Sequence, residues 1–221
     1  GDQAQQVIQN KTLETTAITK TFDNTIDADY YVQNFASKTL TDSEKNIINS
    51  YTGNRYDVLN SELRAYNNLL LEKEKFPNMN IGELSKDILE DRNTLNKALD
   101  KLPNYRNNVY RGLKFDNTKD YNDFINSLEV GQTTSRATFT STSVDREVAL
   151  SFATADDYGA LLKIKSKEGK WLNGLSDIVD EEEVLFKTDS LFEVKKIKTI
   201  SVYDIREGGM VDMVEITMEE I

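Results

Sequence analysis

The sequence predicts an α+β fold, in which a helical half is followed by a mostly antiparallel β half. Apolar residues recur at helical spacing between residues 26 and 102, a pattern typical of amphipathic helices. From residue 105 onwards, short apolar runs alternate with Gly or charged breaks, as short strands do. Pro103 lies where the pattern changes and would end the last helix. Segregated helices and strands of this kind indicate the α+β class.

The helical half is expected to follow a lead-in arm, residues 1–25, which is polar and shows no periodicity. Thr41, with Glu44 three residues later, is the sequence signature of a capping box, so a helix should begin there and end near Gly53. Apolar spacing predicts three further helices, over residues 26–35, 56–70 and 81–102.

The β half is expected to contain mainly short strands, over residues 108–113, 133–143, 160–164, 171–172, 184–187, 192–200 and 211–218. Two helices interrupt them, one over residues 118–128 and a short one that Asp145 would cap. We therefore expect a single domain over residues 26–221, with a helical part over residues 26–104 and a β core over residues 105–221.

Composition excludes several kinds of chemistry. The chain has 27 Lys and Arg against 38 Asp and Glu, a net charge of −11, which argues against a nucleic-acid partner. It has no Cys and no His, so disulfides, Cys/His zinc sites, thiol nucleophiles and Ser-His-Asp triads are excluded. Any catalysis must use carboxylates, hydroxyls and arginines, and no metal is expected.

Nothing in the sequence indicates a membrane span or a targeting segment. No run of about 18 apolar residues is present to cross a bilayer. The first residues contain no basic or apolar segment, so no signal peptide is expected, and a mature secreted form without its leader would look the same.

Arg111 is the first candidate for a binding residue. An Arg within a buried strand must meet an anion, because the guanidinium stays charged and its unpaired burial is costly. Either a structural Glu or a ligand phosphate would satisfy it. Gly112, directly after it, would let a backbone approach closely.

Hydroxyl side chains dominate the stretch after Phe139. Strand alternation places Ser141 and Ser143 on one face, and Thr140 and Thr142 on the other. Such a strand is either an edge or barrel strand, or it lines a cleft in which hydroxyls orient a carboxylate and bind a sugar. No base stands ready to activate these hydroxyls, so we expect them to position other groups.

Three consecutive carboxylates, Glu181, Glu182 and Glu183, precede an apolar run. Alternation would point Glu181 and Glu183 the same way and Glu182 the other way. One interpretation is a solvated acidic turn. The other is a cleft that handles a cation, because like charges on one face raise each other's pKa unless they are exposed or in use. Glycosyl cleavage through an oxocarbenium-like transition state is one such use.

Three motifs occur in this order: Arg111, Ser141-Thr142-Ser143 and Glu181-Glu182-Glu183. Together they resemble the motifs of the mono-ADP-ribosyltransferase toxins, in particular the clostridial binary-toxin branch and its single-domain relatives. Residues 40–60 also look like the N-terminal helix segment of that family, and residues 109–112 look like its first core strand. Each motif alone is weak, but four in this order and spacing are specific.

The resemblance implies a split β-sandwich core that holds NAD in a cleft, with the N-terminal helical layer packed against it. The implied reaction cleaves the bond between nicotinamide and ribose and transfers ADP-ribose to a protein side chain. A length of 221 residues leaves no room for the second, adaptor copy of the fold that binary-toxin enzymes carry. We therefore expect a stand-alone catalytic domain that acts as a monomer, secreted by a bacterium and active as a virulence toxin in the target-cell cytoplasm.

The resemblance also implies roles for single residues. Arg111 would bind the NAD diphosphate, the backbone of Gly112 would hold the nicotinamide amide, and Phe152 would pack against the nicotinamide end. Ser141 would hydrogen-bond Glu183 and fix its rotamer. Glu183 would bond a ribose hydroxyl and stabilise the cation that forms as nicotinamide departs.

Glu181 would orient the acceptor and take its proton. In the family, Glu at this position goes with arginine acceptors and Gln with asparagine acceptors, so the resemblance implies an arginine. An acceptor arginine needs such a base, because its pKa lies above about 12. Glu182 would face away and tolerate replacement.

Two departures from the family pattern affect the target and the affinity. Ile178 and Val179 stand where relatives often place an aromatic that engages the target protein, which leaves the target open. Arg146 is expected as a second phosphate contact, but Ala155 stands where some relatives carry another Arg. A lower NAD affinity is therefore expected.

Two other functions stay open. The chain is alternatively an NAD glycohydrolase whose acceptor is water, or a catalytically silent interaction module of the same fold. The presence of Arg111, Ser141 and Glu183 argues against the silent module. A site that has lost its catalytic function has no physical reason to keep a costly carboxylate pair.

Overall fold

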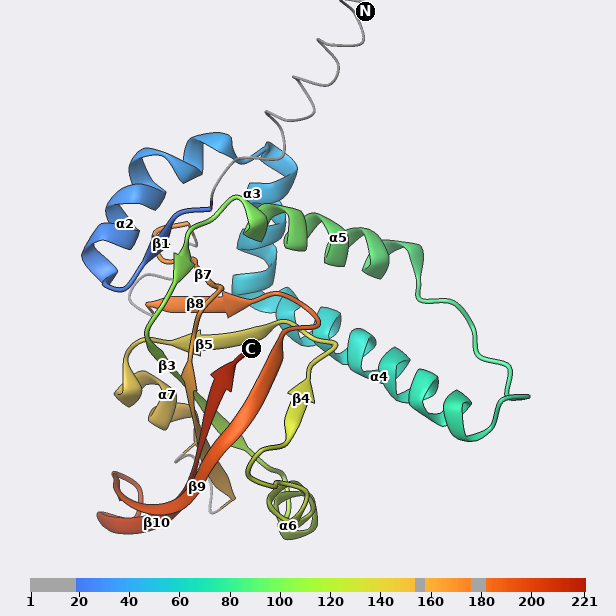
Figure 1. The fold of residues 1–221 in the computed structure, drawn as a ribbon, viewed down its shortest axis with the longest axis vertical. Coiled ribbons are helices and arrows are strands. Elements are labelled where there is room, and N and C mark those ends of the chain that lie inside the picture. The colour runs from blue at the N-terminus through green and yellow to red at the C-terminus, as the bar shows by residue number, and fades with distance from the viewer. Residues whose placement is uncertain (1–18, 154–157, 176–181) are drawn as a thin grey trace, which may run out of the picture.

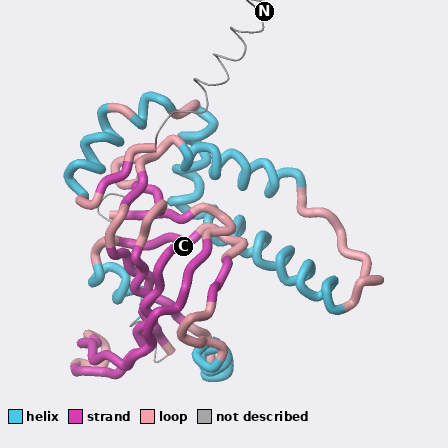
Figure 2. The backbone as a smooth tube through the Cα atoms, in the orientation of Figure 1, coloured by secondary structure: helices cyan, strands magenta, loops and turns pink. Residues whose placement is uncertain are grey.

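The structure, a computed structural model, describes residues 19–153, 158–175 and 182–221. Helices α2, α3 and α5 lie together at one end of the strands, and α4 projects away from them (Figure 1). Most strands come from the C-terminal half of the chain, and Figure 2 shows them gathered in one part of the molecule. The predicted α+β class is confirmed. Of the expected lead-in arm, residues 1–18 lie outside the described residues, and a short strand occupies Thr21–Phe22.

The helices of the described residues are α2, Thr25–Asn34; η1, Ala36–Thr39; α3, Asp42–Ser50; η2, Tyr51–Arg55; α4, Tyr56–Lys75; α5, Lys86–Asp100; α6, Thr118–Asn126; and α7, Arg146–Ala153. The predicted capping box of α3 is confirmed, because Thr41 and Glu44 each accept the backbone N–H of the other through their side chains. Helix α5 begins later than predicted, since the Ser85 hydroxyl accepts the N–H of Ile88 and caps it there.

Helix α3 ends at Ser50 and α4 begins at Tyr56, close to the predicted bounds, but the helical backbone does not break between them. The π-helical turn η2 carries the chain directly from α3 into α4. The Thr52 hydroxyl donates to the carbonyl oxygen of Ile48 at 2.9 Å and supports this widened turn. A glycine inside a helix lowers the stability of the helix by only about 1 kcal/mol relative to alanine. Burial of Tyr51 and Leu59, each at most 2% exposed, outweighs that cost, because each large apolar side chain contributes about 1.5–3 kcal/mol.

The ten strands of the described residues form one hydrogen-bonded sheet in the order β1-β2-β7-β8-β5-β3-β6-β10-β9-β4. Only the β1–β2 and β6–β10 pairs in it are parallel, so the predicted antiparallel character is confirmed. The strands are β1, Thr21–Phe22; β2, Asn104–Tyr105; β3, Asn108–Lys114; β4, Thr133–Ser135; β5, Thr140–Ser143; β6, Gly159–Lys165; β7, Gly169–Trp171; β8, Glu183–Phe186; β9, Leu191–Asp204; and β10, Gly209–Glu220.

The single strand predicted over residues 133–143 is two strands in different parts of the sheet. β4 pairs with β9 at the edge, whereas β5 lies between β8 and β3. Residues 136–139 link them. The Thr and Ser composition favours extended backbone throughout, but it does not encode a change of pairing partner.

The two halves of the sheet meet between β3 and β5 through a single residue pair, Tyr110 with Ser143. Beyond this pair, β3 follows β6 and β5 follows β8. The strands therefore diverge beside Arg111 and Ser141. This divergence corresponds to the split core that the resemblance implies.

One buried apolar cluster joins the helical layer to the sheet. It includes Ile48, Leu59, Leu95, Phe139, Trp171 and Phe186. The rings of Tyr51 and Phe139 meet edge to face, with their centroids 5.6 Å apart. This packing holds the α3–α4 segment beside β5, where it forms one wall of the candidate site.

Candidate active site

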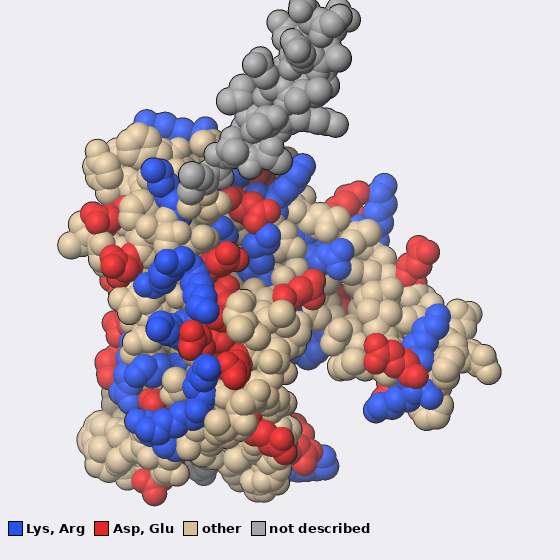
Figure 3. Space-filling model, viewed as in Figure 1, with Lys and Arg blue, Asp and Glu red and all other residues tan. Residues whose placement is uncertain are grey.

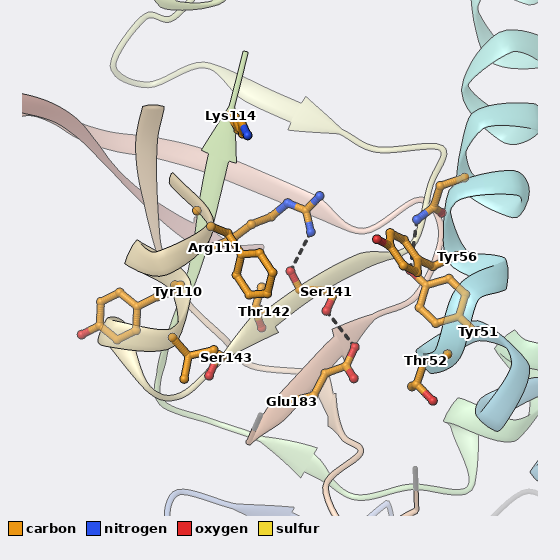
Figure 4. Close-up of a pocket in the computed structure, with 16 residues that line it drawn as sticks. Tyr51, Thr52, Tyr56, Tyr110, Arg111, Lys114, Ser141, Thr142, Ser143 and Glu183 are labelled. Atoms are coloured by element: carbon orange, nitrogen blue, oxygen red, sulfur yellow. Dashed lines mark hydrogen bonds between the residues drawn. The ribbon is translucent and has the colours of Figure 1, made fainter. Parts of the chain in front are cut away.

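A pocket of about 480 Å³ lies where β3 and β5 diverge. Its walls come from the η2–α4 segment, from β3, β5 and β8, and from α7 (Figure 4). Five of the predicted site residues line it: Arg111, Gly112, Ser141, Phe152 and Glu183. A pocket of this size is typical of small-molecule sites.

Ser141 and Glu183 are joined by a hydrogen bond within this pocket. Ser141 Oγ donates to Glu183 Oε1 at 2.7 Å, drawn as a dashed line in Figure 4. The antiparallel pairing of β5 with β8 holds the two backbones in register. Glu183 is only 9% exposed, so the bond fixes the orientation of a largely buried carboxylate. The contact that the resemblance implies is therefore present.

Arg111 reaches across the same opening from β3. Its Nη1 donates to the carbonyl oxygen of Ser141 at 2.8 Å, whereas its Nε is buried and makes no hydrogen bond with the described residues. Burial lowers the pKa of Arg111, but a guanidinium remains protonated in proteins. Within the described part of the chain no carboxylate forms an ion pair with it, so the alternative of a structural Glu partner has no support there.

Gly112 has a packing role that the sequence did not reveal. A Cβ at this position would collide with the carbonyl oxygen of Ala149 and lie 2.9 Å from the nitrogen of Ala153, both in α7. Gly159 on β6 is restricted by the same helix, since its Cβ would meet the carbonyl of Ala153. The close backbone approach predicted at Gly112 is thus made by α7, which forms a wall of the pocket.

Tyr51 and Asn60 are pocket residues that the sequence reasoning missed. Asn60 Nδ2 donates to the hydroxyl oxygen of Tyr51 at 3.0 Å, and Asn60 Oδ1 accepts the N–H of Phe139 at 3.1 Å. Burial raises the pKa of Tyr51, so its phenol stays neutral at physiological pH. The sequence held a signal for Asn60, because helical spacing places this polar side chain beside the apolar face of α4 and therefore near the core.

The carboxylate run divides at the start of β8. Glu183 is the first strand residue, and Glu182 before it lies outside the strand, so alternation along a strand does not apply to Glu182. Glu182 has a left-handed backbone with φ 42°, and its carbonyl accepts the N–H of Val144 at 3.1 Å. Glu181, like Ile178 and Val179, lies outside the described residues.

Arg146 and Phe152 both lie on α7 but have different surroundings. Arg146 lines a second pocket of about 520 Å³ between α7 and the β9–β10 hairpin, 3.7 Å from the carboxylate of Glu147. The structure therefore does not bring it into the pocket with Arg111. Phe152 is 57% exposed and lies in the lining of that first pocket. Ala155 lies outside the described residues.

Neither a metal site nor a membrane-spanning helix occurs in the described ranges. No three or more Asp and Glu side chains gather there as a metal would require. No helix there is both long and apolar enough to cross a membrane.

Two curated proteins are similar to this chain. The putative NAD(+)–arginine ADP-ribosyltransferase Vis of Vibrio splendidus is 28% identical over 169 residues, 73% of this chain and 62% of that protein. The putative NAD(+)–arginine ADP-ribosyltransferase Mav of Mycobacterium avium is 33% identical over 144 residues, 65% of this chain and 15% of that protein. The matched region is thus less than two thirds of the length of either relative.

Solved structures share the fold. The crystal structure of Vis with agmatine superposes with a TM-score of 0.62, at 24% identity over 89% of this chain and 84% of that one. The crystal structure of the Clostridium limosum C3 exoenzyme superposes with a TM-score of 0.61, at 19% identity over 92% of this chain and 98% of that one. The family model of the ADP-ribosyltransferase exoenzymes matches residues 27–217. This chain therefore belongs to the ADP-ribosyltransferase exoenzyme family.

Proposed function

We propose that the chain is a mono-ADP-ribosyltransferase toxin, which cleaves NAD between nicotinamide and ribose and transfers ADP-ribose to an arginine of a target protein. The observation that carries this proposal is the Ser141–Glu183 hydrogen bond with Arg111 beside it in one pocket. The two curated relatives support it, since their names describe arginine-directed enzymes.

NAD is the proposed substrate, and the pocket offers groups that suit its parts. Arg111 would bind the diphosphate, because a guanidinium matches phosphate oxygens with two parallel hydrogen bonds. The backbone of Gly112 would hold the nicotinamide amide, and Phe152 would pack against the nicotinamide end. Arg146 is left out, since it lines the other pocket.

Glu183 would act on the ribose. When the bond between the ribose carbon and the nicotinamide nitrogen breaks, its electron pair leaves with nicotinamide and positive charge develops on the ribose. A carboxylate held nearby stabilises this charge more strongly in the transition state than in the ground state. Ser141 would be a positioning residue, because it fixes the carboxylate through their hydrogen bond.

The acceptor is proposed to be an arginine guanidinium, whose nitrogen attacks the ribosyl cation and loses a proton. Glu181 would orient the guanidinium and accept that proton, since the acceptor has a pKa above about 12 and needs a base at the moment of attack. The carboxylate at this sequence position is the basis for the assignment.

The proposed setting follows from the same assignment. Residues 26–221 would form one catalytic domain, and the protein would act as a monomer, be secreted by a bacterium, and serve virulence by modifying a protein in the target-cell cytoplasm. A nucleic-acid partner is not proposed, because the net charge is −11. On the face drawn in Figure 3, Lys and Arg side chains lie among Asp and Glu side chains rather than alone.

Incubation with adenine-labelled NAD and agmatine tests the function. Wild type should label agmatine and release nicotinamide, and Glu183→Gln should lower both rates by about 100-fold to 1,000-fold. Glu182→Gln is the matched control and should leave both rates close to wild type. Wild-type nicotinamide release no faster than that of Glu183→Gln would overturn the proposal. Nicotinamide release without labelled agmatine would instead indicate an NAD glycohydrolase, and failure to bind NAD in calorimetry would indicate a silent module.

A further inference from the structure

Helix α2 packs against the end of β7 through the carboxylate of Asp29 (Figure 1). Asp29 Oδ1 accepts the indole N–H of Trp171 at 2.7 Å. Trp171 is the last residue of β7, is fully buried, and packs against Tyr105 with the ring centroids 5.3 Å apart. An indole N–H can only donate, so a buried one needs an acceptor. This need alone would give Asp29 a purely structural role.

A second contact of Asp29 goes beyond that need. The side-chain amide of Asn173 donates to the same carboxylate, with Nδ2 lying 3.2 Å from Oδ1 and 3.4 Å from Oδ2. Gly174 follows with a φ of 85°, and a Cβ there would lie 3.4 Å from Nε2 of Gln33, one turn further along α2. Hydrogen bonds to an ionised carboxylate are stronger than those between neutral groups. Helix α2 therefore fixes both the end of β7 and the direction of the chain that leaves it.

The segment that Asp29 holds is bonded to the backbone of Glu183. Leu172, between the two residues that Asp29 contacts, is buried, and its N–H donates to the carbonyl oxygen of Glu183 at 3.0 Å. Trp171 pairs with Val184 in the antiparallel pairing of β7 with β8. On the other side, β5 holds Glu183 through its pairing with Ser143. The backbone of Glu183 thus has two supports, and Asp29 secures the one on the β7 side.

We propose that Asp29 is a positioning residue for NAD cleavage, which secures Leu172 and thereby holds the backbone from which the Glu183 carboxylate reaches the ribose. This inference rests on the proposed function. Asp29 does not line the pocket itself, so it acts through Leu172 and not on the substrate. A displacement of about 1 Å at a reacting group can lower a rate by about 100-fold. Ser141 fixes the orientation of the carboxylate, and Asp29 fixes the strand end that carries it.

Steady-state kinetics of nicotinamide release from NAD tests this assignment. Asp29→Ala should lower kcat by about tenfold and change the KM for NAD by less than about twofold, because Glu183 is displaced while Arg111 and the pocket walls stay in place. Asp27→Ala is the matched control. It removes a carboxylate from the same helix, but the side-chain bond that it loses, from Asn24 at 2.9 Å, lies at the N-terminus of α2. This control should keep the wild-type kcat and KM.

Amide hydrogen exchange at Leu172 gives a readout that does not depend on activity. Exchange there should be about tenfold faster in Asp29→Ala than in wild type, and unchanged in Asp27→Ala.

Asp29→Asn is the second variant, since it keeps one oxygen for the Trp171 indole but loses the charge. We expect its kcat to fall by about threefold. Three results overturn the assignment: a wild-type kcat in Asp29→Ala, a large rise in KM at unchanged kcat, or unchanged exchange at Leu172. Should Asp29→Ala not fold, the same results in Asp29→Asn decide. The proposed function fails separately, when wild type releases nicotinamide no faster than Glu183→Gln, and exchange at Leu172 then still decides whether Asp29 secures that residue.

Discussion

The carboxylate of Glu183 is held by Ser141, whose hydroxyl donates to Oε1 at 2.7 Å and whose carbonyl oxygen accepts from Arg111 at 2.8 Å. One residue of β5 therefore connects the anionic and the cationic side chain of the pocket. The single contact point between β3 and β5 makes this possible, because the strands diverge next to it and leave room for both side chains.

Replacement of Ser141 by Ala should lower the turnover rate for NAD cleavage by about tenfold to 100-fold, which corresponds to the loss of one hydrogen bond to a charged group. The KM for NAD should change much less, because the hydroxyl orients Glu183 and does not itself bind the diphosphate. Steady-state kinetics of nicotinamide release measures both constants. Ser151→Ala, on the exposed side of α7, is the control. A large rise in KM at an unchanged turnover rate would contradict this role.

Replacement of Gly112 by Ala should destabilise the protein by about 1–3 kcal/mol, because the added methyl group would push α7 away from β3. Gly53→Ala provides the matched control. A Cβ there meets nothing within 4 Å, and Ala is the better helix former by about 1 kcal/mol, so this variant should be as stable as wild type or more stable. Urea unfolding compares the two. Equal stability of both variants would show that the packing of α7 against β3 does not require a glycine at position 112.

Glu44 should make stability depend on acid pH. Burial would raise the pKa of Glu44, but hydrogen bonds from Lys101 and from the N–H of Thr41 outweigh it, so the pKa lies below the ordinary value. A carboxyl whose pKa is lowered by folding contributes stability that is present above its unfolded value of about 4.3, and that is lost as pH falls through the folded value.

The difference in unfolding free energy between wild type and Glu44→Gln should therefore be largest near about pH 6 and shrink toward about pH 3. Urea unfolding at several pH values measures it. Glu62→Gln, at an exposed position on α4, should differ little from wild type throughout. A difference for Glu44→Gln that stays constant over this range would show that the ion pair with Lys101 adds nothing.

Replacement of Glu181 by Ala should abolish transfer to agmatine while NAD hydrolysis continues, because water does not need the base that a guanidinium needs. The ratio of labelled agmatine to released nicotinamide measures this division. Equal loss of both activities would assign Glu181 to bond cleavage instead.

The sequence by itself indicated the class of the fold and five of the residues that line the pocket. Helical spacing, the Thr41 capping box and the hydroxyl-rich stretch are local patterns, and they are visible because the residues that interact lie close in the chain. The motifs from Arg111 to Glu183 pointed to residues that now line one pocket.

Only the tertiary structure decided how these residues meet. Ser141 and Glu183 are 42 residues apart, and Asn60 lies 79 residues from the Phe139 N–H that it accepts. The break between β4 and β5, the continuous helix through Gly53, and the position of Arg146 in a second pocket all depend on which distant strand or helix each segment packs against. Local propensity carries no information about such partners, because burial and pairing energies arise only once the distant segments are in contact.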